Sequence, residues 1–422
     1  MVAFFLLFLI SVSAVWKKYG GASVVSSFEG SPLPKFRSSD LGQDFIEVEN
    51  RQNVKLNHPT GPSACIKGAK CIALAVVAGI YEKEECKNAI HGAACNFLCG
   101  TMANLAYHAT EAKNFNANNS DVKYDMVLVH DSSFPKVHLE TLNDMGVRLL
   151  HVDDSIKRAA CDGLKNATMK LDCTAAISLE RKVNYEVPEF LIQIMKLHVF
   201  TMKEYDAIFS FDTDAYLTDL NEVTDVTLRY LRTKFSLIAN QRGLSPVNAG
   251  YFVGRPNSKA IELWIDDVKA GFTEENGWAN YGPIAHTWPR LWRNPNHRHE
   301  LGGWNFLGAN RDQGLLFHIF ALHLQSLGLT NGHLWYGHDT RIPIPKVSGT
   351  TFLNRDWNLH VRHLFSTPKP WDEGACKDEK HEQFVYFTRA MLPAVKENFE
   401  HHRIPMLRQC LSRFLNNNEV CK

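Results

Sequence analysis

Short apolar runs alternate with longer amphipathic stretches along the chain from about residue 65 onward. Such short runs, rich in β-branched and aromatic residues, are typical of buried strands. In chain order they are 71–77, 124–130, 147–152, 207–211, 236–239 and 251–253. The longer stretches predict helices near residues 89–110, 188–202, 312–320 and 382–415. This alternation predicts an α/β fold with a mostly parallel sheet flanked by helices, in which ligands bind at the carboxyl ends of the strands.

The first 64 residues have a different pattern. An uncharged apolar run, residues 3–16, precedes Lys17 and Lys18. It is shorter than the roughly 20 residues of a membrane-spanning helix. The small residues Val12-Ser13-Ala14 fit a signal-peptide cleavage site, and an uncleaved signal anchor also fits. Both forms predict entry into the secretory pathway and a place in the ER or Golgi lumen, either membrane-anchored or secreted.

The chain is therefore expected to have three parts. Residues 1–16 are a signal peptide or signal anchor, and residues 17–64, rich in Ser, Gly, Pro and charge, are a stem or linker. Residues 65–422 form a single domain with an aromatic-rich insert at about 271–306 and a C-terminal helical extension.

Composition narrows the partners. Lys and Arg total 46 against 45 Asp and Glu, so no basic surplus points to nucleic acid. Ten cysteines agree with an oxidising lumen, as do two glycosylation sequons, Asn118-Asn119-Ser120 and Asn166-Ala167-Thr168. Spacing leaves the cysteine connectivity open. The candidate pairs are Cys161 with Cys173, and Cys376 with Cys410 or Cys421.

Two carboxylates follow directly on the strand predicted at 207–211. Asp212 and Asp214, separated by Thr213, can converge on one divalent cation, and oxygen ligands suit Mn²⁺ or Mg²⁺. Such an ion can neutralise a diphosphate and so stabilise it as a leaving group. About one Asp-x-Asp triplet arises by chance in a chain of this size, so a solvated turn is the alternative for the triplet alone.

The same triplet is compatible with a haloacid-dehalogenase-like phosphatase. That family also places Asp-x-Asp after an apolar strand, but its pattern has Thr or Val two residues beyond the second Asp, where this chain has Tyr216. Asp266-Asp267 imitate the later acidic pair of that family, although they lie in a predicted helix.

Four segments between Pro188 and Asp372 occur in the order of a known family. They are Lys196-Leu197 with Tyr205-Asp206-Ala207 leading into Asp212-Thr213-Asp214; Asn248-Ala249-Gly250; Asp312-Gln313-Gly314-Leu315-Leu316; and His363-Leu364-Phe365-Ser366-Thr367-Pro368-Lys369-Pro370-Trp371. With these segments the chain resembles glycosyltransferase family 8, the glycogenin-like and galactinol-synthase-like enzymes. The resemblance implies a GT-A fold with a Rossmann-like sheet. It also implies retaining transfer of a sugar from a nucleotide-diphosphate sugar, by analogy a UDP-sugar, to a hydroxyl acceptor.

The resemblance also implies residue roles. The metal ligands for Mn²⁺ or Mg²⁺ would be Asp212, Asp214 and His363. The residues at the reacting sugar would be Asp312, Gln313 and Lys196. The residues that bind the nucleotide sugar would be Tyr81, Phe211, Asp212, Thr213, Asp214, Asn248, Ala249, Gly250, Ser366 and Lys369. Lys369 would act as a point charge on the diphosphate, and Gly250, without a Cβ, lets the backbone approach a ligand closely.

Three of these residues have a structural alternative. Asp312 is suited to be the N-cap of its helix, His363 to be a core histidine, and Lys369 to be an exposed loop lysine. Two positions depart from the family pattern. The first strand ends in Val77-Ala78-Gly79-Ile80 where the family has polar residues, so only Tyr81 matches, and Ser366 stands where the family often has Gly.

In the implied mechanism the departing phosphate oxygen takes the acceptor proton, while the metal, His363 and Lys369 stabilise the leaving diphosphate. The acceptor is a carbohydrate, glycoprotein, lipid or polyol. The alternative to an enzyme is a non-catalytic carbohydrate-binding relic of the transferase fold. Retention of Asp212, Asp214, His363 and Lys369 argues against that alternative.

Two further features have more than one interpretation. The insert contains Trp278, Trp288, Trp292 and Trp304, which form either a stacking platform for an acceptor sugar or the small core of a loop packed on itself. His91, Cys95 and Cys99 recur every four residues as a zinc-site candidate, for which disulfides or buried thiols are the alternative.

Overall fold

The computed structural model describes most of the chain beyond residue 55. The described residues are 56–65, 68–80, 93–178, 186–217, 219–242, 245–282, 284, 304, 306, 308–330, 340–341, 358–359, 361–363, 391–401 and 405–420. They all belong to one compact unit, residues 36–422. No helix among them is both long and apolar enough to cross a membrane. The predicted signal segment 1–16 lies outside the described residues, and so do Tyr81, Ser366 and Lys369.

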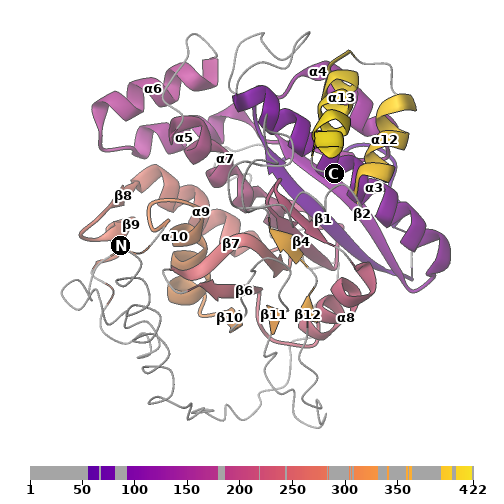
Figure 1. Cartoon of the computed structure of the whole chain (residues 1–422). Coiled ribbons are helices and arrows are strands. Elements are labelled where there is room, and N and C mark those ends of the chain that lie inside the picture. Colours follow the sequence, from indigo (N-terminus) through magenta and orange to yellow (C-terminus); the bar gives the residue numbers. More distant parts are fainter. Residues whose placement is uncertain are drawn as a thin grey trace, which may run out of the picture. The chain divides into compact units, whose positions relative to one another are not determined.

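Among the described residues, seven strands form the central sheet (Figure 1). They are β1 (Lys70–Ala78), β2 (Val122–His130), β3 (Arg148–His151), β4 (Ala207–Phe211), β6 (Leu237–Arg242), β7 (Ser245–Gly254) and β10 (Leu327–Thr330). Their order across the sheet is β10-β6-β7-β4-β1-β2-β3. β7 runs antiparallel to β4 and β6, and the other neighbouring pairs are parallel. The predicted α/β class with a mostly parallel, Rossmann-like sheet is confirmed.

Alternating side chains of β1 enter two cores, one on each face of the sheet. Leu74 and Val76 belong to one cluster of buried residues, and Ala75 and Val77 belong to the other. A strand that is buried on both faces has a continuous apolar sequence, which is why apolar runs alone predicted the central strands.

The helices divide between these two faces (Figure 1). The Leu74 face carries α3 (Ala93–Asn118), α4 (Lys136–Asp144), α8 (Leu220–Tyr230), α12 (Leu392–His401) and α13 (Pro405–Val420). The Ala75 face carries α5 (Asp154–Gly163), α6 (Ala167–Ser178), α7 (Glu186–Met195), α9 (Ser258–Ala270) and α10 (Asp312–Phe317). Two of these helices continue in a different helical form. A 3₁₀ helix, η1 (Lys196–Thr201), follows α7, and a π-helix, η3 (His318–His323), follows α10.

Small strand pairs complete the described part of the chain. They are β5 (Ala215–Leu217) with β13 (Val361–His363), β8 (Phe272–Thr273) with β9 (Gly277–Trp278), and β11 (Thr340–Arg341) with β12 (Asn358–Leu359). The segment before β1 also packs on the sheet. The backbones of Thr60 and Leu149 exchange hydrogen bonds of 2.8 and 3.0 Å, and Ser63 Oγ donates to Asp125 Oδ2 at 2.5 Å.

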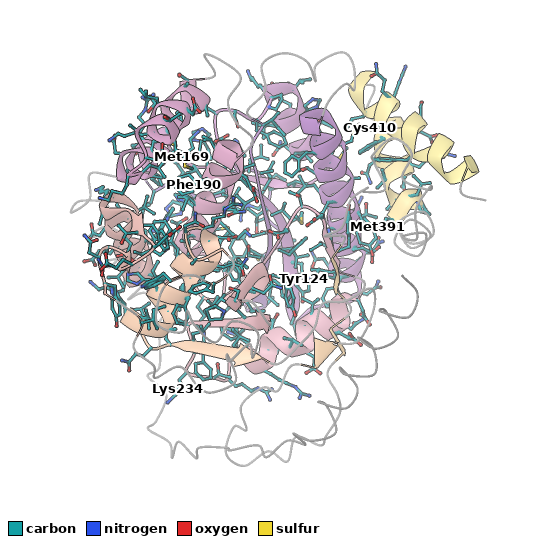
Figure 2. The ribbon with its side chains drawn as sticks, turned by 60° about the vertical axis from the view of Figure 1, so that its left-hand side comes forward. Tyr124, Met169, Phe190, Lys234, Met391 and Cys410 are labelled. Atoms are coloured by element: carbon teal, nitrogen blue, oxygen red, sulfur yellow. A yellow bond between two sulfur atoms is a disulfide. The ribbon has the colours of Figure 1, made fainter. Side chains whose placement is uncertain are left out.

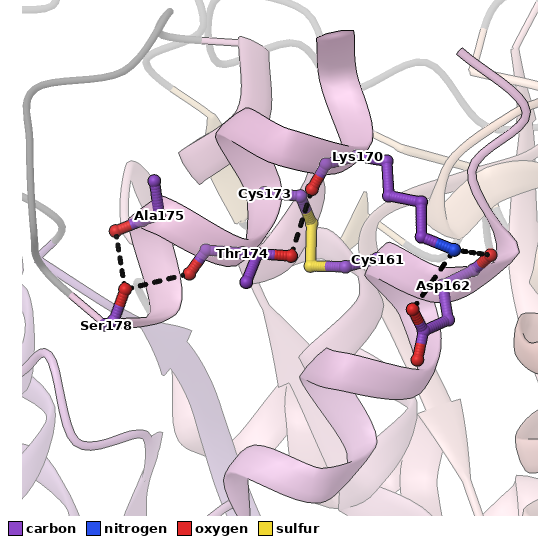
Figure 3. The surroundings of a disulfide bond; sticks show 7 residues. All are labelled: Cys161, Asp162, Lys170, Cys173, Thr174, Ala175 and Ser178. Carbon is purple, nitrogen blue, oxygen red and sulfur yellow. Dashed lines mark hydrogen bonds and ion pairs between the residues drawn. A yellow bond between two sulfur atoms is a disulfide. The ribbon is translucent and has the colours of Figure 1, made fainter. Parts of the chain in front are cut away.

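A disulfide between residues close in the sequence joins α5 to α6. It links Cys161 and Cys173, one of the pairs expected from spacing. Beside it, Lys170 Nζ lies 3.1 Å from Asp162 Oδ1, so an ion pair spans the same two helices (Figure 3).

A long-range disulfide joins α3 to α13. Cys410 pairs with Cys99, so the candidate pairing of Cys410 with Cys376 is wrong. Met391, the residue before α12, and Cys410 both lie in the core cluster to which α3 contributes. Figure 2 labels both residues on the C-terminal part of the chain. The bond also removes Cys99 from the zinc-site candidate with His91 and Cys95, because a disulfide sulfur is not a thiolate ligand.

Two tryptophans of the aromatic-rich insert are core residues. Trp278 and Trp304 are 2% and 1% exposed, and their indole N–H groups donate to Ala309 O and Gly282 O. Gly277 has φ +69, and a Cβ there would overlap the Trp304 ring. The packed-loop interpretation therefore holds for these two residues, while Trp288 and Trp292 lie outside the described residues.

Candidate active site

The Asp-x-Asp turn lies at the middle of the sheet, at the carboxyl end of β4. β4 pairs with β1, and strands that follow β1 in the chain lie on both of its sides, β2 and β3 on one and β4, β7, β6 and β10 on the other. Such a switch point is where open α/β sheets bind ligands. Asp212 N donates to Gly250 O at 2.9 Å, and Ala215 N donates to Asp212 O at 2.9 Å. The tight turn presents both Asp212 and Asp214 with partly exposed side chains.

Lys196 brings two carboxylates together. Its Nζ lies 2.7 Å from Asp212 Oδ1 and 2.6 Å from Asp312 Oδ2. A third acceptor, Ala249 O, lies at 3.0 Å. Four segments of the chain, η1, the end of β4, β7 and α10, therefore meet at one ammonium group.

The charge of Lys196 is stabilised by these partners. Burial opposes the ammonium form, but the carboxylates of Asp212 and Asp312 outweigh it and raise the pKa of Lys196 above its usual value. An ammonium group has three N–H donors, and three acceptors lie within 3.0 Å of Lys196 Nζ. All three N–H groups of the Lys196 ammonium can therefore donate to acceptors within the protein.

Asp312 makes two contacts at once. Oδ2 pairs with Lys196, and Oδ1 accepts a hydrogen bond from Gln313 N at 2.8 Å. Asp312 is the first residue of α10, and the N-cap position itself is Arg311. Gly308 has φ +73, and a Cβ there would lie 2.8 Å from Gln313 Nε2, so glycine at this position leaves room for the Gln313 side chain.

The Asn248-Ala249-Gly250 segment lies in β7 beside the Asp-x-Asp turn. Asn248 Oδ1 accepts from Gly250 N at 3.0 Å, and the pairing of β6 with β7 is irregular at Asn240, opposite Asn248. Irregular pairing of this kind redirects side chains and is frequent next to active sites. Gly250 O in turn accepts from Asp212 N, which joins the two predicted motifs directly.

Two residues of α3 that the sequence analysis missed stabilise the turn from the core side. Asn104 Nδ2 donates to Thr213 O at 3.0 Å and to Ala215 O at 2.8 Å. His108 Nε2 accepts from Leu217 N at 2.9 Å, so the proton is on Nδ1, which lies 2.9 Å from Asn104 O. Burial lowers the pKa of His108 to about 3, so the ring is neutral. A polar pair four residues apart on a buried helix face was the available signal.

The carboxyl end of β2 carries a second, fully buried ion pair. Lys157 Nζ lies 2.7 Å from Asp131 Oδ2, and both side chains are 0% exposed. Ser133 Oγ donates to Asp131 Oδ1 and accepts from Ile80 N, which fixes the chain as it leaves β1. Asp131 directly follows the apolar run 124–130, the same strand-end signal that identified Asp212, so it was detectable from the sequence.

Of the remaining predicted residues, two are only partly placed at this site. The His363 backbone in β13 pairs with that of Ala215 in β5, and Ala215 is the residue that follows Asp214. The Phe211 ring is fully buried, with its centroid 4.8 Å from that of His108, so its side chain packs in the core.

Among solved structures, several are similar to parts of this chain at low sequence identity. No protein-family model matches the chain, and no curated protein matches it. The apo structure of the bifunctional glycosyltransferase WbbM is 12% identical with a TM-score of 0.41, and the match covers 84% of this chain and 53% of WbbM. This chain thus spans about half the length of WbbM.

Two smaller solved enzymes are also similar. The galactosyltransferase LgtC, in complex with donor and acceptor sugar analogues, is 12% identical with a TM-score of 0.35, covering 72% of this chain and 90% of LgtC. Apo mouse xyloside xylosyltransferase 1 is 10% identical with a TM-score of 0.32, covering 70% and 97%.

Proposed function

We propose that the protein is a metal-dependent, retaining glycosyltransferase of the GT-A type, similar to family 8, which moves a sugar from a UDP-sugar to a hydroxyl acceptor. The observation that carries the proposal is the convergence of Asp212 and Asp312 on Lys196 at the switch point of the sheet. The order of the four motif segments supports it, because three of them meet in that one cluster: the segments that contain Asp212, Ala249 and Asp312.

The donor set fits a hard divalent cation. Asp212 is 32% exposed at its side chain, whereas Asp312 is 6% exposed, so Asp212 is the carboxylate of the cluster that is open to a ligand. Oxygen donors on a rigid turn suit Mn²⁺ or Mg²⁺. Asp212, Asp214 and His363 would bind the ion, which supplies positive charge at the donor diphosphate when bound.

Lys196 is assigned a positioning role. Its three N–H groups point to Asp212, Ala249 and Asp312, so it orients both carboxylates instead of contacting the donor. Asp312 and Gln313, at the start of α10, are the polar groups assigned to the donor sugar. Fixed partners of this kind keep a site in its productive geometry without reorganisation during the reaction.

The protein's own groups then have defined tasks in the transfer. His363 and Lys369 stabilise the negative charge that develops on the departing diphosphate. The departing phosphate oxygen takes the proton of the acceptor hydroxyl as the new glycosidic bond forms on the same face of the sugar, so no protein base is required.

Calorimetric titration with UDP, with and without Mn²⁺, tests the proposal. We expect Mn²⁺-dependent binding that Asp212→Asn/Asp214→Asn abolishes and that the control Asp144→Asn/Asp162→Asn keeps, because the control changes two exposed carboxylates far along the chain. Phosphate-ester hydrolysis is assayed in parallel. Asp212-dependent hydrolysis without UDP binding would establish the phosphatase alternative, and absence of both would leave the non-catalytic relic.

A further inference from the structure

A cluster of three ligand-type side chains lies on the Ala75 face of the sheet and takes no part in the proposed donor site. Asp267 of α9 meets His318 and His323 of η3, and one potential ligand atom from each lies within 4.8 Å of the others. Among the described residues, it is the one group of three or more His, Cys, Asp or Glu side chains arranged in this way.

Three polar atoms of the two buried members of this cluster lack hydrogen-bond partners among the described residues. His318 is 0% exposed and Asp267 is 2% exposed. Neither ring nitrogen of His318, nor Asp267 Oδ2, has a hydrogen-bond partner within the part of the chain that the structure describes. Asp267 Oδ2 and His318 Nε2 are only 3.2 Å apart, yet they are not aligned as donor and acceptor. Unpartnered buried polar groups are costly, so native proteins normally satisfy them, and a bound ion is one way.

The π-helix explains why the two histidines meet. In an α-helix, residues five apart point about 140° away from each other. In a π-helix the hydrogen bonds run from i to i+5, which brings such residues closer to the same side of the helix. Leu324 N donates to Ile319 O at 2.8 Å in this pattern, and the rings of His318 and His323 have centroids 4.3 Å apart. π-Helical turns are rare and occur frequently at functional sites.

We propose that Asp267, His318 and His323 form a Zn²⁺ site. Two imidazole nitrogens and one carboxylate oxygen are a donor set that binds Zn²⁺ in preference to Mn²⁺ or Mg²⁺. In a tetrahedral zinc site with bonds of about 2.0 Å, neighbouring ligand atoms lie about 3.3 Å apart. The Asp267–His318 separation already matches this value, and the exposed His323 side chain completes the set by a small rotation.

An aromatic side chain packs against both histidines. The Tyr281 ring lies 5.2 Å from His318 and 5.4 Å from His323. The two residues before Tyr281, Ala279 and Asn280, both have φ +53, a backbone conformation that costs energy outside glycine and is concentrated at functional sites.

The site joins α9 to the segment that continues α10. Since α10 begins at Asp312 and ends where η3 begins, zinc would anchor the far end of the helix that carries a proposed donor-site residue. Three protein ligands leave a fourth tetrahedral position for a solvent molecule on the exposed His323 side.

The test uses the full chain carrying Asp212→Asn/Asp214→Asn, so that the proposed donor site does not contribute. After chelation, the protein is titrated with Zn²⁺ by calorimetry and with Co²⁺ by visible spectroscopy. We expect one Zn²⁺ per chain, and a Co²⁺ spectrum of four-coordinate type. In the same background, His323→Gln and Asp267→Asn are each expected to weaken Zn²⁺ binding at least about tenfold. Even a residue that only hydrogen-bonds to a metal ligand contributes about that much to metal affinity, and a ligand itself contributes no less. His58→Gln, which changes an exposed histidine outside the cluster, is the matched control.

Circular dichroism and melting temperature check each variant for folding, and the exposed His323 makes its substitution the safer of the two. Zinc is expected to raise the melting temperature of the background protein and to leave that of His323→Gln unchanged. Absence of Zn²⁺ binding, or binding unchanged by both ligand substitutions, overturns the proposal. Failure of UDP binding in the native protein does not bear on it, so the two proposals fail separately.

Discussion

At the scale of single residues, Lys196 carries a charge in a buried position where only its fixed partners stabilise it. We predict that Lys196→Met destabilises the fold by about 3–5 kcal/mol, because the Asp312 carboxylate is left buried without a counter-charge. Adding Asp312→Asn removes that charge and is expected to recover most of the loss. Urea unfolding of the single and double variants measures the coupling, with Lys113→Met on the exposed surface of α3 as the control. Strictly additive losses would show that the two residues do not form one unit.

Two buried histidines test the difference between a partnered and an unpartnered ring. His108→Leu orphans the Leu217 N–H, so we expect a loss of about 1–3 kcal/mol at pH 7.5. His138 has no hydrogen-bond partner for either ring nitrogen among the described residues, and His138→Leu is expected to leave stability unchanged or raise it. Urea unfolding of both variants decides the matter, and equal losses would contradict it.

The same histidines predict how stability depends on pH. Burial lowers the pKa of His108 to about 3 and that of His138 to about 4, below the value of about 6.5 in the unfolded chain. The unfolded state therefore binds more protons below pH 6.5. The stability each neutral ring contributes is complete above pH 6.5 and declines as pH falls toward the folded pKa, by about 1.4 kcal/mol per pH unit. Between pH 7.5 and pH 5 wild type should lose more unfolding free energy than His138→Leu does, so the stability advantage of the variant grows, and parallel pH curves would refute this.

At the scale of elements, a long-range disulfide links the C-terminal helix α13 to α3 of the sheet domain. Cys99 and Cys410 are separated by 311 residues, whereas Cys161 and Cys173 are separated by 12. In the chain-entropy model the longer loop contributes about 3 kcal/mol more to stability. Cys99→Ala/Cys410→Ala is thus expected to lower the free energy of unfolding clearly more than Cys161→Ala/Cys173→Ala does. Urea titrations under non-reducing conditions compare them, and a larger effect of the short loop would show that local packing outweighs loop entropy.

Elements with a local cause were predictable, and those that depend on distant partners were not. The apolar runs predicted the central strands because burial on both faces requires them to be apolar. The helix from Asp312 was predicted, but its change to a π-helix at His318 was not, since no local propensity marks it. Likewise, the pairing of Cys410 with Cys99 and the contact of Asn104 with Thr213 depend on how α3 packs, which spacing does not encode.

At the scale of the whole molecule, the proposed donor site is a meeting point of segments that no stretch of sequence contains. Lys196 comes from η1, Asp212 from the end of β4, Ala249 from β7 and Asp312 from α10. A ligand that binds there contacts several elements together and stabilises their closed hydrogen bonds. The motif order predicted which segments meet, but the ion pairs that join them follow only from the folded sheet.

This convergence predicts a pattern of hydrogen exchange over the whole chain. With Mn²⁺ and UDP, we expect slower amide exchange in the peptides that contain residues 211–217, 248–250 and 312–314, because these segments surround the switch point. The outer strands β3 and β10 should exchange at unchanged rates, since they lie at the edges of the sheet. Asp212→Asn/Asp214→Asn should remove the protection without changing exchange in the absence of ligand. A ligand at the carboxyl end of β4 should slow exchange most at the backbone amides of the Asp212–Asp214 turn. Protection that is spread evenly over the sheet, or concentrated around Asp267 on α9, would therefore place the nucleotide elsewhere.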